Sequence, residues 1–223
     1  MGFVVAIDGP AGSGKGTITK LVAEKRNLVA IDTGAMYRCI TLDCLNNNIK
    51  PTDIDGINKI LDKIKIELKL ENGEQKFFLN DKDVGSQIRT KKIDDYVSLF
   101  AAIKEVRDKV TPMQQKMGDN QNIIMEGRDI GTVVFPNADV KIFLDCSAEE
   151  RARRRFIQNQ KEGIQTSYEE ILNNVIERER INSTRDIAPF VKADDAIVVD
   201  STNMSIDEVV ETILKIIDEK LEK

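Results

Sequence analysis

The most informative absence from this sequence is histidine, which does not occur once in 223 residues. Mechanisms that need an imidazole base, such as Ser-His-Asp and Cys-His hydrolysis, are therefore excluded. The chain also lacks any apolar run near the ~18 residues that a membrane-spanning helix requires. Its three cysteines, Cys39, Cys44 and Cys146, are never spaced as CxxC, so a tetrahedral zinc site would lack its usual ligands. We interpret them as buried or incidental thiols of a reducing cytoplasm.

The composition is that of an ordinary globular protein, with 41% hydrophobic and 32% charged residues. The 33 basic residues against 38 acidic ones give a net charge of −5, which argues against nucleic acid as a partner. The first residues, Met1 to Ala6, carry no basic flank, so we expect no signal peptide. These observations predict a cytoplasmic protein that binds neither nucleic acid nor membrane. The sequence suggests no large apolar surface, and we expect a monomer.

Short apolar runs alternate with helical patterns along most of the chain. We expect five buried strands, at residues 3–7, 28–31, 122–125, 140–144 and 196–199, with helices at 15–26 and 34–45. This alternation predicts an α/β fold of the P-loop NTPase type, a five-stranded parallel sheet with helices on both faces. Capping boxes predict further helix starts at Ser147, Ser167 and Ser205.

One segment breaks the alternation. Residues 64–70 alternate apolar and polar, residues 71–74 form a turn signal, and residues 76–79 run back, which predicts a β-hairpin. We therefore expect a small antiparallel subdomain, inserted between the second and third strands of the sheet.

A glycine-rich loop follows the first strand and opens a helix. It consists of Gly9, Pro10, Ala11, Gly12, Ser13, Gly14, Lys15, Gly16 and Thr17. Its backbone N–H groups would surround an anion, and Lys15 would reach the β- and γ-phosphates of a nucleoside triphosphate. Gly16 stands where switch GTPases have Ser or Thr, and the hydroxyl comes one place later as Thr17. The Asp53-Ile54-Asp55-Gly56 string matches the DxxG of GTPases, but it lies in a polar stretch and is better interpreted as a turn or helix cap.

Arginines occur where an anionic second substrate would need them. Arg38 follows the second strand and Arg128 follows the third, at the carboxyl ends where doubly wound sheets bind ligands. A phosphate acceptor is largely deprotonated at pH 7, with a second pKa near ~6, so it needs cations and no base. Glu126, at the end of the third strand, would steer magnesium. Arg151, Arg154 and Arg155 share one face of a predicted helix, which favours lid arginines over a nucleic-acid patch.

Five motifs in this order resemble bacterial cytidylate kinases. They are Gly9–Thr17, Asp32–Arg38, Ile88-Arg89-Thr90, Glu126–Pro136 and Ser183-Thr184-Arg185-x-x-Ala188-Pro189. The resemblance implies direct in-line transfer of the ATP γ-phosphoryl group to CMP or dCMP, with magnesium. It also implies one P-loop kinase domain over 1–223, containing a monophosphate-binding insert at 33–100 and a lid at 151–166.

The resemblance further assigns individual residues. Arg38 and Arg128 match the clamp on the acceptor phosphate, and Arg151 and Arg155 match the lid pair, so that Lys15, Arg128, Arg151 and Arg155 would be catalytic. Thr33, Arg107, Asp129 and Arg185 match the base readers, and Ser98, Arg178 and Asn182 the pentose readers. Thr17 and Glu126 would hold magnesium through water. The family usually has Asp at the position of Asn182, and it often has Pro shortly before the position of Arg107.

Two of these assignments have independent support. A carboxylate such as Asp129 suits the exocyclic amino group of cytosine, and arginines suit its acceptors. Arg178, Asn182 and Arg185 are spaced i, i+4, i+7, so a continuing helix would present them together. Two other functions remain open: another small-molecule P-loop kinase, of adenylate or shikimate type, and an ATP-gated regulator without turnover.

Overall fold

The computed structural model describes residues 2–71, 74–161 and 163–222. The chain forms two compact units, a core unit of residues 1–32 and 115–223 and an inserted unit of residues 33–114. Each unit contains a sheet of its own.

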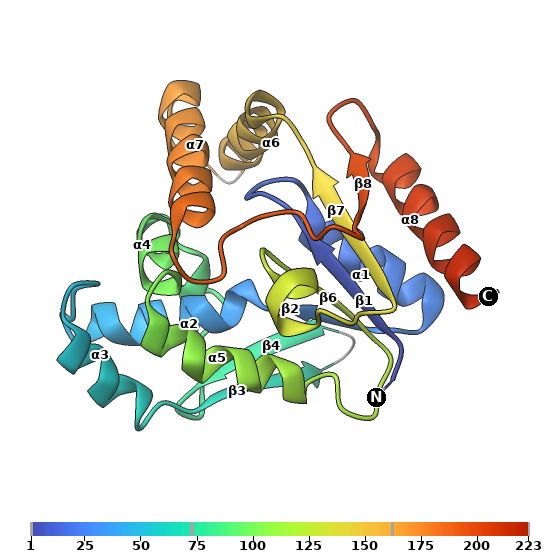
Figure 1. The fold of residues 1–223 in the computed structure, drawn as a ribbon. Helices are drawn as coiled ribbons and strands as arrows, with labels where there is room; N and C mark the ends of the chain where they lie inside the picture. The colour runs from blue at the N-terminus through green and yellow to red at the C-terminus, as the bar shows by residue number, and fades with distance from the viewer. Residues whose placement is uncertain (1, 72–73, 162, 223) are drawn as a thin grey trace. The chain divides into compact units, whose positions relative to one another are not determined.

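The core unit contains the parallel sheet that the apolar runs predict. Its strands are β1 (Val4–Asp8), β2 (Val29–Asp32), β6 (Ile123–Gly127), β7 (Val140–Asp145) and β8 (Ile197–Asp200), in the order β2-β6-β1-β7-β8. All four pairings are parallel, and β1 in the centre pairs Val4 with Ile123 and Val5 with Val140. The central position of β1 places the loop that follows it at the middle of the sheet's carboxyl edge (Figure 1).

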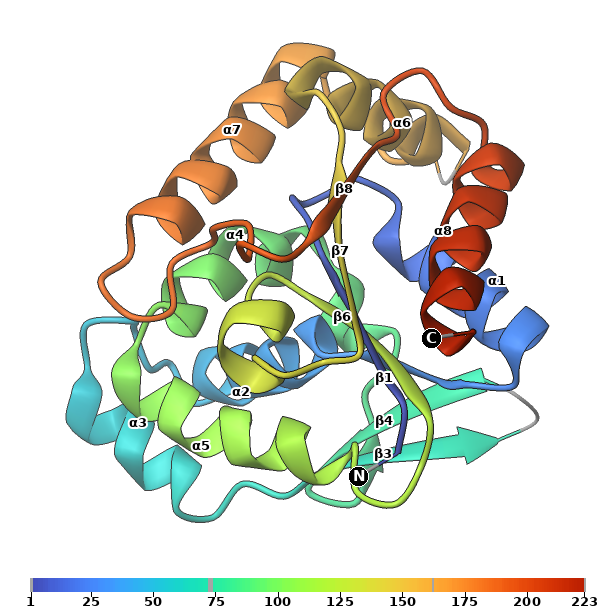
Figure 2. The ribbon, with the colours of Figure 1, turned by 45° about the vertical axis from the view of Figure 1, so that its right-hand side comes forward.

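Helices cover both faces of this sheet, as expected. Helices α1 (Lys15–Arg26) and α8 (Ile206–Leu221) lie side by side on one face, where residues such as Val22 and Ile213 pack against the strands (Figures 1 and 2). The opposite face is covered by η2 (Ile130–Val134), a π-helical turn that no sequence pattern predicts. Helix α8 begins with the predicted capping box, in which Ser205 and Glu208 bond each other's backbone N–H groups.

Helices α6 (Ala148–Lys161) and α7 (Tyr168–Thr184) pack against each other through a small apolar cluster that includes Ala152, Ile171 and Val175. Ser147 and Ser167 accept hydrogen bonds from the backbone three residues on, as their motifs predict. None of the helices that the structure describes is both apolar enough and long enough to span a lipid bilayer.

The inserted unit combines helices with an antiparallel sheet. Its helices are α2 (Gly34–Asn46), α3 (Ile54–Leu61), η1 (Gln87–Arg89), α4 (Lys91–Ala101) and most of α5 (Lys104–Lys116). The predicted hairpin is confirmed as β3 (Ile66–Glu71) and β4 (Glu74–Leu79), although residues 72–73 of its expected turn lie outside the described residues. A third strand, β5 (Lys82–Asp83), was not expected. Asp53 is a helix cap, because its carboxylate accepts from Gly56 N at 2.9 Å.

Candidate functional site

The glycine-rich loop connects the central strand β1 to α1. Gly12 and Gly14 have φ angles of 81° and 88°, in the left-handed region that only glycine adopts readily. Lys15 starts α1 as the sequence predicts, and its ammonium group is turned back into the loop, donating to Pro10 O at 2.8 Å and to Ser13 Oγ at 3.4 Å. The loop is therefore a compact turn closed around a buried cation at the first turn of a helix.

The Lys15 ammonium is buried among charges of both signs. Burial lowers the pKa of the Lys15 ammonium well below its usual value, and the nearby Arg128 cation lowers this pKa further. Glu126, Asp8 and Asp32 act in the opposite direction on the same pKa. Two cations held close together and out of water favour a strong anion between or beside them, which is what a phosphate supplies.

Glu126 and Thr17 lie where the sequence places a metal site. A Cβ built on Gly16 would be 3.0 Å from Glu126 Oε1, so the carboxylate occupies the place where other P-loops carry a Ser or Thr side chain. Thr17 is exposed on the first turn of α1. A carboxylate and a hydroxyl beside a phosphate loop are hard oxygen donors, so this pair of residues fits magnesium.

Arg128 and Asp129 directly follow β6. Arg128 donates to Gly127 O at 3.2 Å, and its guanidinium lies over the Phe190 ring at 5.9 Å. Burial, and then the nearby Arg178, lowers the pKa of Arg128 to about 10. Asp129 is buried and contacts Arg185 Nη2 at 3.4 Å. A predicted phosphate ligand and a predicted base reader thus lie side by side at the carboxyl end of one strand.

The predicted pentose and base ligands at the end of α7 lie near Arg128 and Asp129, but one of them is not on the helix. The helix ends at Thr184, so Arg185 is not part of it and a continuing helix is wrong. Arg185 instead folds back from extended backbone, donating to Ala188 O at 2.7 Å and to Asn182 Oδ1 at 3.4 Å. Asn182 in turn donates to Arg178 O at 2.6 Å. The structure therefore brings Arg128, Asp129, Arg178, Asn182 and Arg185 together within the core unit.

The two predicted lid arginines have different surroundings. Arg151 is buried, and it donates to Cys146 O at 2.8 Å, to Ala11 O of the phosphate loop at 3.2 Å and to Glu179 on α7. Arg155 is half-buried and donates to Gln158 on its own helix at 3.1 Å. Arg151 therefore already contacts the phosphate loop, and its charge is balanced by Glu179.

Four predicted substrate residues lie in the inserted unit. Thr33 is the N-cap residue of α2, and Ser98 is buried on α4. Arg38 donates to Ile88 O at 3.0 Å and forms an ion pair with Asp94 at 2.6 Å. Arg107 is buried, donates to Ala101 O at 3.1 Å and stacks over the Tyr37 ring. Both arginines are fixed by neighbours inside their own unit.

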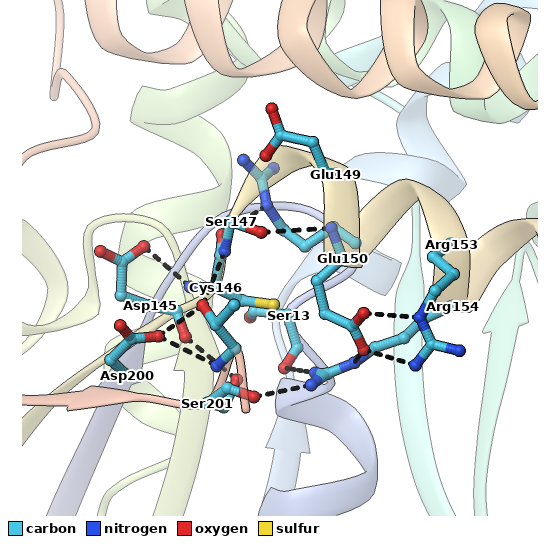
Figure 3. Close-up of polar contacts among 12 residues, drawn as sticks. Ser13, Asp145, Cys146, Ser147, Glu149, Glu150, Arg153, Arg154, Asp200 and Ser201 are labelled. Carbon is cyan, nitrogen blue, oxygen red and sulfur yellow. Dashed lines mark hydrogen bonds and ion pairs between the residues drawn. The ribbon is translucent and has the colours of Figure 1, made fainter. Parts of the chain in front are cut away.

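One residue near the loop, Asp8, was not predicted to have a role. It ends β1, and its carboxylate accepts from Ile130 N and Gly131 N, both at 2.8 Å, directly after Asp129. A charged residue at the end of a fully buried strand was the signal that could have found it. Arg154 was predicted to share the lid face of its helix with Arg151 and Arg155, and Figure 3 shows it reaching from α6 to Ser13 of the phosphate loop.

Comparisons with known proteins indicate one family. The family model described as "Cytidylate kinase" matches residues 5–219. The cytidylate kinase of Fusobacterium nucleatum subsp. nucleatum is 51% identical over 221 residues, covering 99% of this chain and 98% of that protein. The cytidylate kinase of Bacillus subtilis is 44% identical over 216 residues, covering 97% and 96%. The structure of shikimate kinase from Acinetobacter baumannii in complex with shikimate is 14% identical, with a TM-score of 0.51 over 100% of this chain and 97% of that one, which shows the fold alone.

Proposed function

The chain belongs to the cytidylate kinase family, and from that premise we propose that it transfers the γ-phosphoryl group of ATP to CMP and dCMP, forming CDP and dCDP. The observation that supports this most is the environment of Lys15. Its ammonium is buried in a phosphate loop, and burial and the nearby Arg128 both lower its pKa. That arrangement is unfavourable without an anion and favourable when a donor and an acceptor phosphate both approach.

The protein does not need to remove a proton from the acceptor, because the phosphate of CMP is already largely deprotonated at neutral pH. Lys15 and the loop N–H groups hold the donor phosphates. Arg128, with Arg151 and Arg155, neutralises the charge that moves between the two nucleotides. We expect Arg38 to bind the acceptor phosphate as well. A chain without histidine suits such a reaction, since no general base is needed.

We expect Asp129 and its neighbours to bind the cytosine base. The Asp129 carboxylate accepts from the amino group of cytosine, which uracil replaces with a carbonyl oxygen. Arg185 holds this carboxylate in place and offers further donors to the acceptors of the ring. Thr33 and Arg107 complete the base readers, and Ser98, Arg178 and Asn182 serve the pentose. Asn182 lacks the charge of the usual Asp, so it holds the sugar hydroxyls as a neutral amide.

Glu126 and Thr17 would hold magnesium together with the ATP phosphates and water. The ion neutralises the charge of the β- and γ-phosphates when it is bound. The protein's own contribution is to keep a carboxylate against the start of α1, where Gly16 leaves room for it.

An ADP-release assay tests this function. The purified chain is given ATP and magnesium with CMP, dCMP, UMP, AMP or shikimate in separate reactions, with ATP alone as the control. We expect the highest kcat/KM for CMP and dCMP. A preference for AMP or shikimate would assign a different kinase, and ATP binding without ADP release from any acceptor would favour the regulator.

The proposal extends to the state of the enzyme in the cell. We expect a monomer in the cytoplasm that binds no nucleic acid, in keeping with its net charge of −5 and its buried thiols. The division of the single kinase domain into a core, a monophosphate-binding insert at 33–100 and a lid at 151–166 is part of the same proposal.

A further inference from the structure

Arg154 joins three segments of the core unit that lie far apart in sequence. From the second turn of α6, its guanidinium donates to Ser13 O in the phosphate loop at 3.4 Å and to Ser201 O, just after β8, at 2.7 Å. Its Nε donates to Glu150 on its own helix at 2.9 Å. Figure 3 shows the guanidinium lying between the two carbonyl groups, with Glu150 beside it. All three nitrogens of the guanidinium are therefore used on protein groups.

The partners of Arg154 are themselves held in place. Ser201 is buried, and its N–H and hydroxyl groups both bond to Asp145 O, at 2.9 and 3.0 Å. Glu150 also bonds Arg153, and the hydrogen bonds from Arg153 and Arg154 bring the pKa of Glu150 to about 2. The carboxylate that orients Arg154 is thus ionised at any physiological pH. On one side the guanidinium is anchored to the sheet, and on the other it reaches the loop.

The hydrogen bond from Arg154 to Ser13 O also sets the direction of the Gly14 N–H in the phosphate loop. In a trans peptide the C=O and N–H groups point in opposite directions, so holding Ser13 O toward Arg154 turns the N–H of Gly14 away from it. Gly14 has a φ of 88°, and a glycine at that position can adopt the flipped peptide at little cost. Without an anchor, this peptide could present its carbonyl oxygen to an incoming phosphate instead of its N–H.

We propose that Arg154 is a positioning residue that locks the Ser13–Gly14 peptide in the orientation that binds the phosphates of ATP. It acts through the loop backbone and leaves the phosphates themselves to Lys15, Arg151 and Arg155. A lysine cannot replace it, because one ammonium on a flexible stem does not reproduce the planar fork that reaches two carbonyls. The proposal rests on the proposed function only in that the loop binds ATP.

The chain supplies a matched control in Arg153. It neighbours Arg154 on the same helix and shares the carboxylate of Glu150, but its side chain is 59% exposed and, among the described residues, its bonds stay within α6. The experiment uses the full chain and the variants Arg154→Ala, Arg154→Lys and Arg153→Ala, each checked for folding by circular dichroism. Dissociation constants are measured for ATP, for CMP and for inorganic tripolyphosphate, which has the phosphate chain but no base.

We expect Arg154→Ala and Arg154→Lys to weaken ATP and tripolyphosphate binding by a similar factor, about tenfold. CMP binding should stay within twofold, and Arg153→Ala should match the wild type for all three probes. If ATP weakens while tripolyphosphate does not, Arg154 acts on the adenosine side through Ser201, and the proposal is overturned. Unchanged ATP affinity in a folded variant, or an equal loss for CMP, overturns it too. Because these are binding measurements, they remain decisive even if no monophosphate is phosphorylated.

Discussion

The buried carboxyl of Asp8 makes the free energy of unfolding depend on pH. Its carboxyl is buried, and this burial raises its pKa from 3.8 to about 6, against the lowering effect of the hydrogen bonds from Gly131 and Ile130. The neighbouring Asp129 raises the same pKa and Lys15 lowers it. The folded chain therefore binds a proton at Asp8 more tightly than the unfolded chain does. It follows that the stability contributed by this group increases as the pH falls from 7 toward 4, and decreases as the pH rises through 6.

Integrating the proton linkage between pH 7 and pH 5 gives an increase of about 1.3 kcal/mol in the free energy of unfolding at pH 5. Histidine is the side chain that usually titrates between pH 5 and pH 7, and this chain contains none. The assay is urea unfolding without nucleotide, followed by circular dichroism at both pH values. Asp8→Asn does not titrate, so it should lack this increase relative to the wild type.

Asp139→Asn is the matched control for this measurement. Asp139 accepts from Val4 N at 2.7 Å, at the opposite end of the same strand, and the variant retains Asp8. It should therefore keep the wild-type gain at pH 5. If Asp8→Asn gains as much stability at pH 5 as the wild type does, the raised pKa is assigned to the wrong group.

Three further predictions concern the reaction itself. Lys15→Ala should lose most of kcat, because charge on the β- and γ-oxygens goes uncompensated; turnover within about threefold of the wild type, ~0.6 kcal/mol, would contradict its role. Asp129→Ala should reduce kcat/KM for CMP far more than for UMP, and equal losses would mean that this carboxylate does not contact the amino group. Gly16→Ser adds a side chain whose Cβ lies 3.0 Å from Glu126 Oε1, so it should raise the magnesium concentration needed for half-maximal rate. An unchanged magnesium requirement would exclude Glu126 as a metal-steering acid.

The parts of the fold that follow local patterns were predicted well. The five strands lie within two residues of their expected positions, since buried parallel strands appear as short apolar runs. Helix α1 has the predicted bounds, Lys15–Arg26, because the glycine-rich loop fixes its start. The hairpin was found from its alternation, whereas the two-residue strand β5 is too short to show any period.

The details that the sequence did not predict depend on partners far along the chain. Arg151 and Arg154 were predicted to share one helix face, but nothing in that spacing indicated that Glu179 and Glu150 balance their charges. The partner of Arg151 is 28 residues away, and no local spacing indicates it. Arg185 leaves its helix with extended backbone, and its guanidinium bonds to Ala188 O and Asn182 Oδ1, which the i, i+4, i+7 spacing did not indicate.

The ion pair between Arg38 and Asp94 affects how the enzyme would complete a cycle. Both side chains are mostly buried, so Arg38 already has a carboxylate partner when no nucleotide is bound. A phosphate that binds Arg38 exchanges one anionic contact for another, and only the difference between the two contributes to affinity. If Arg38 binds the acceptor phosphate as proposed, Asp94 would pair with the guanidinium again as the diphosphate leaves. The ion pair would then weaken phosphate binding and speed product release.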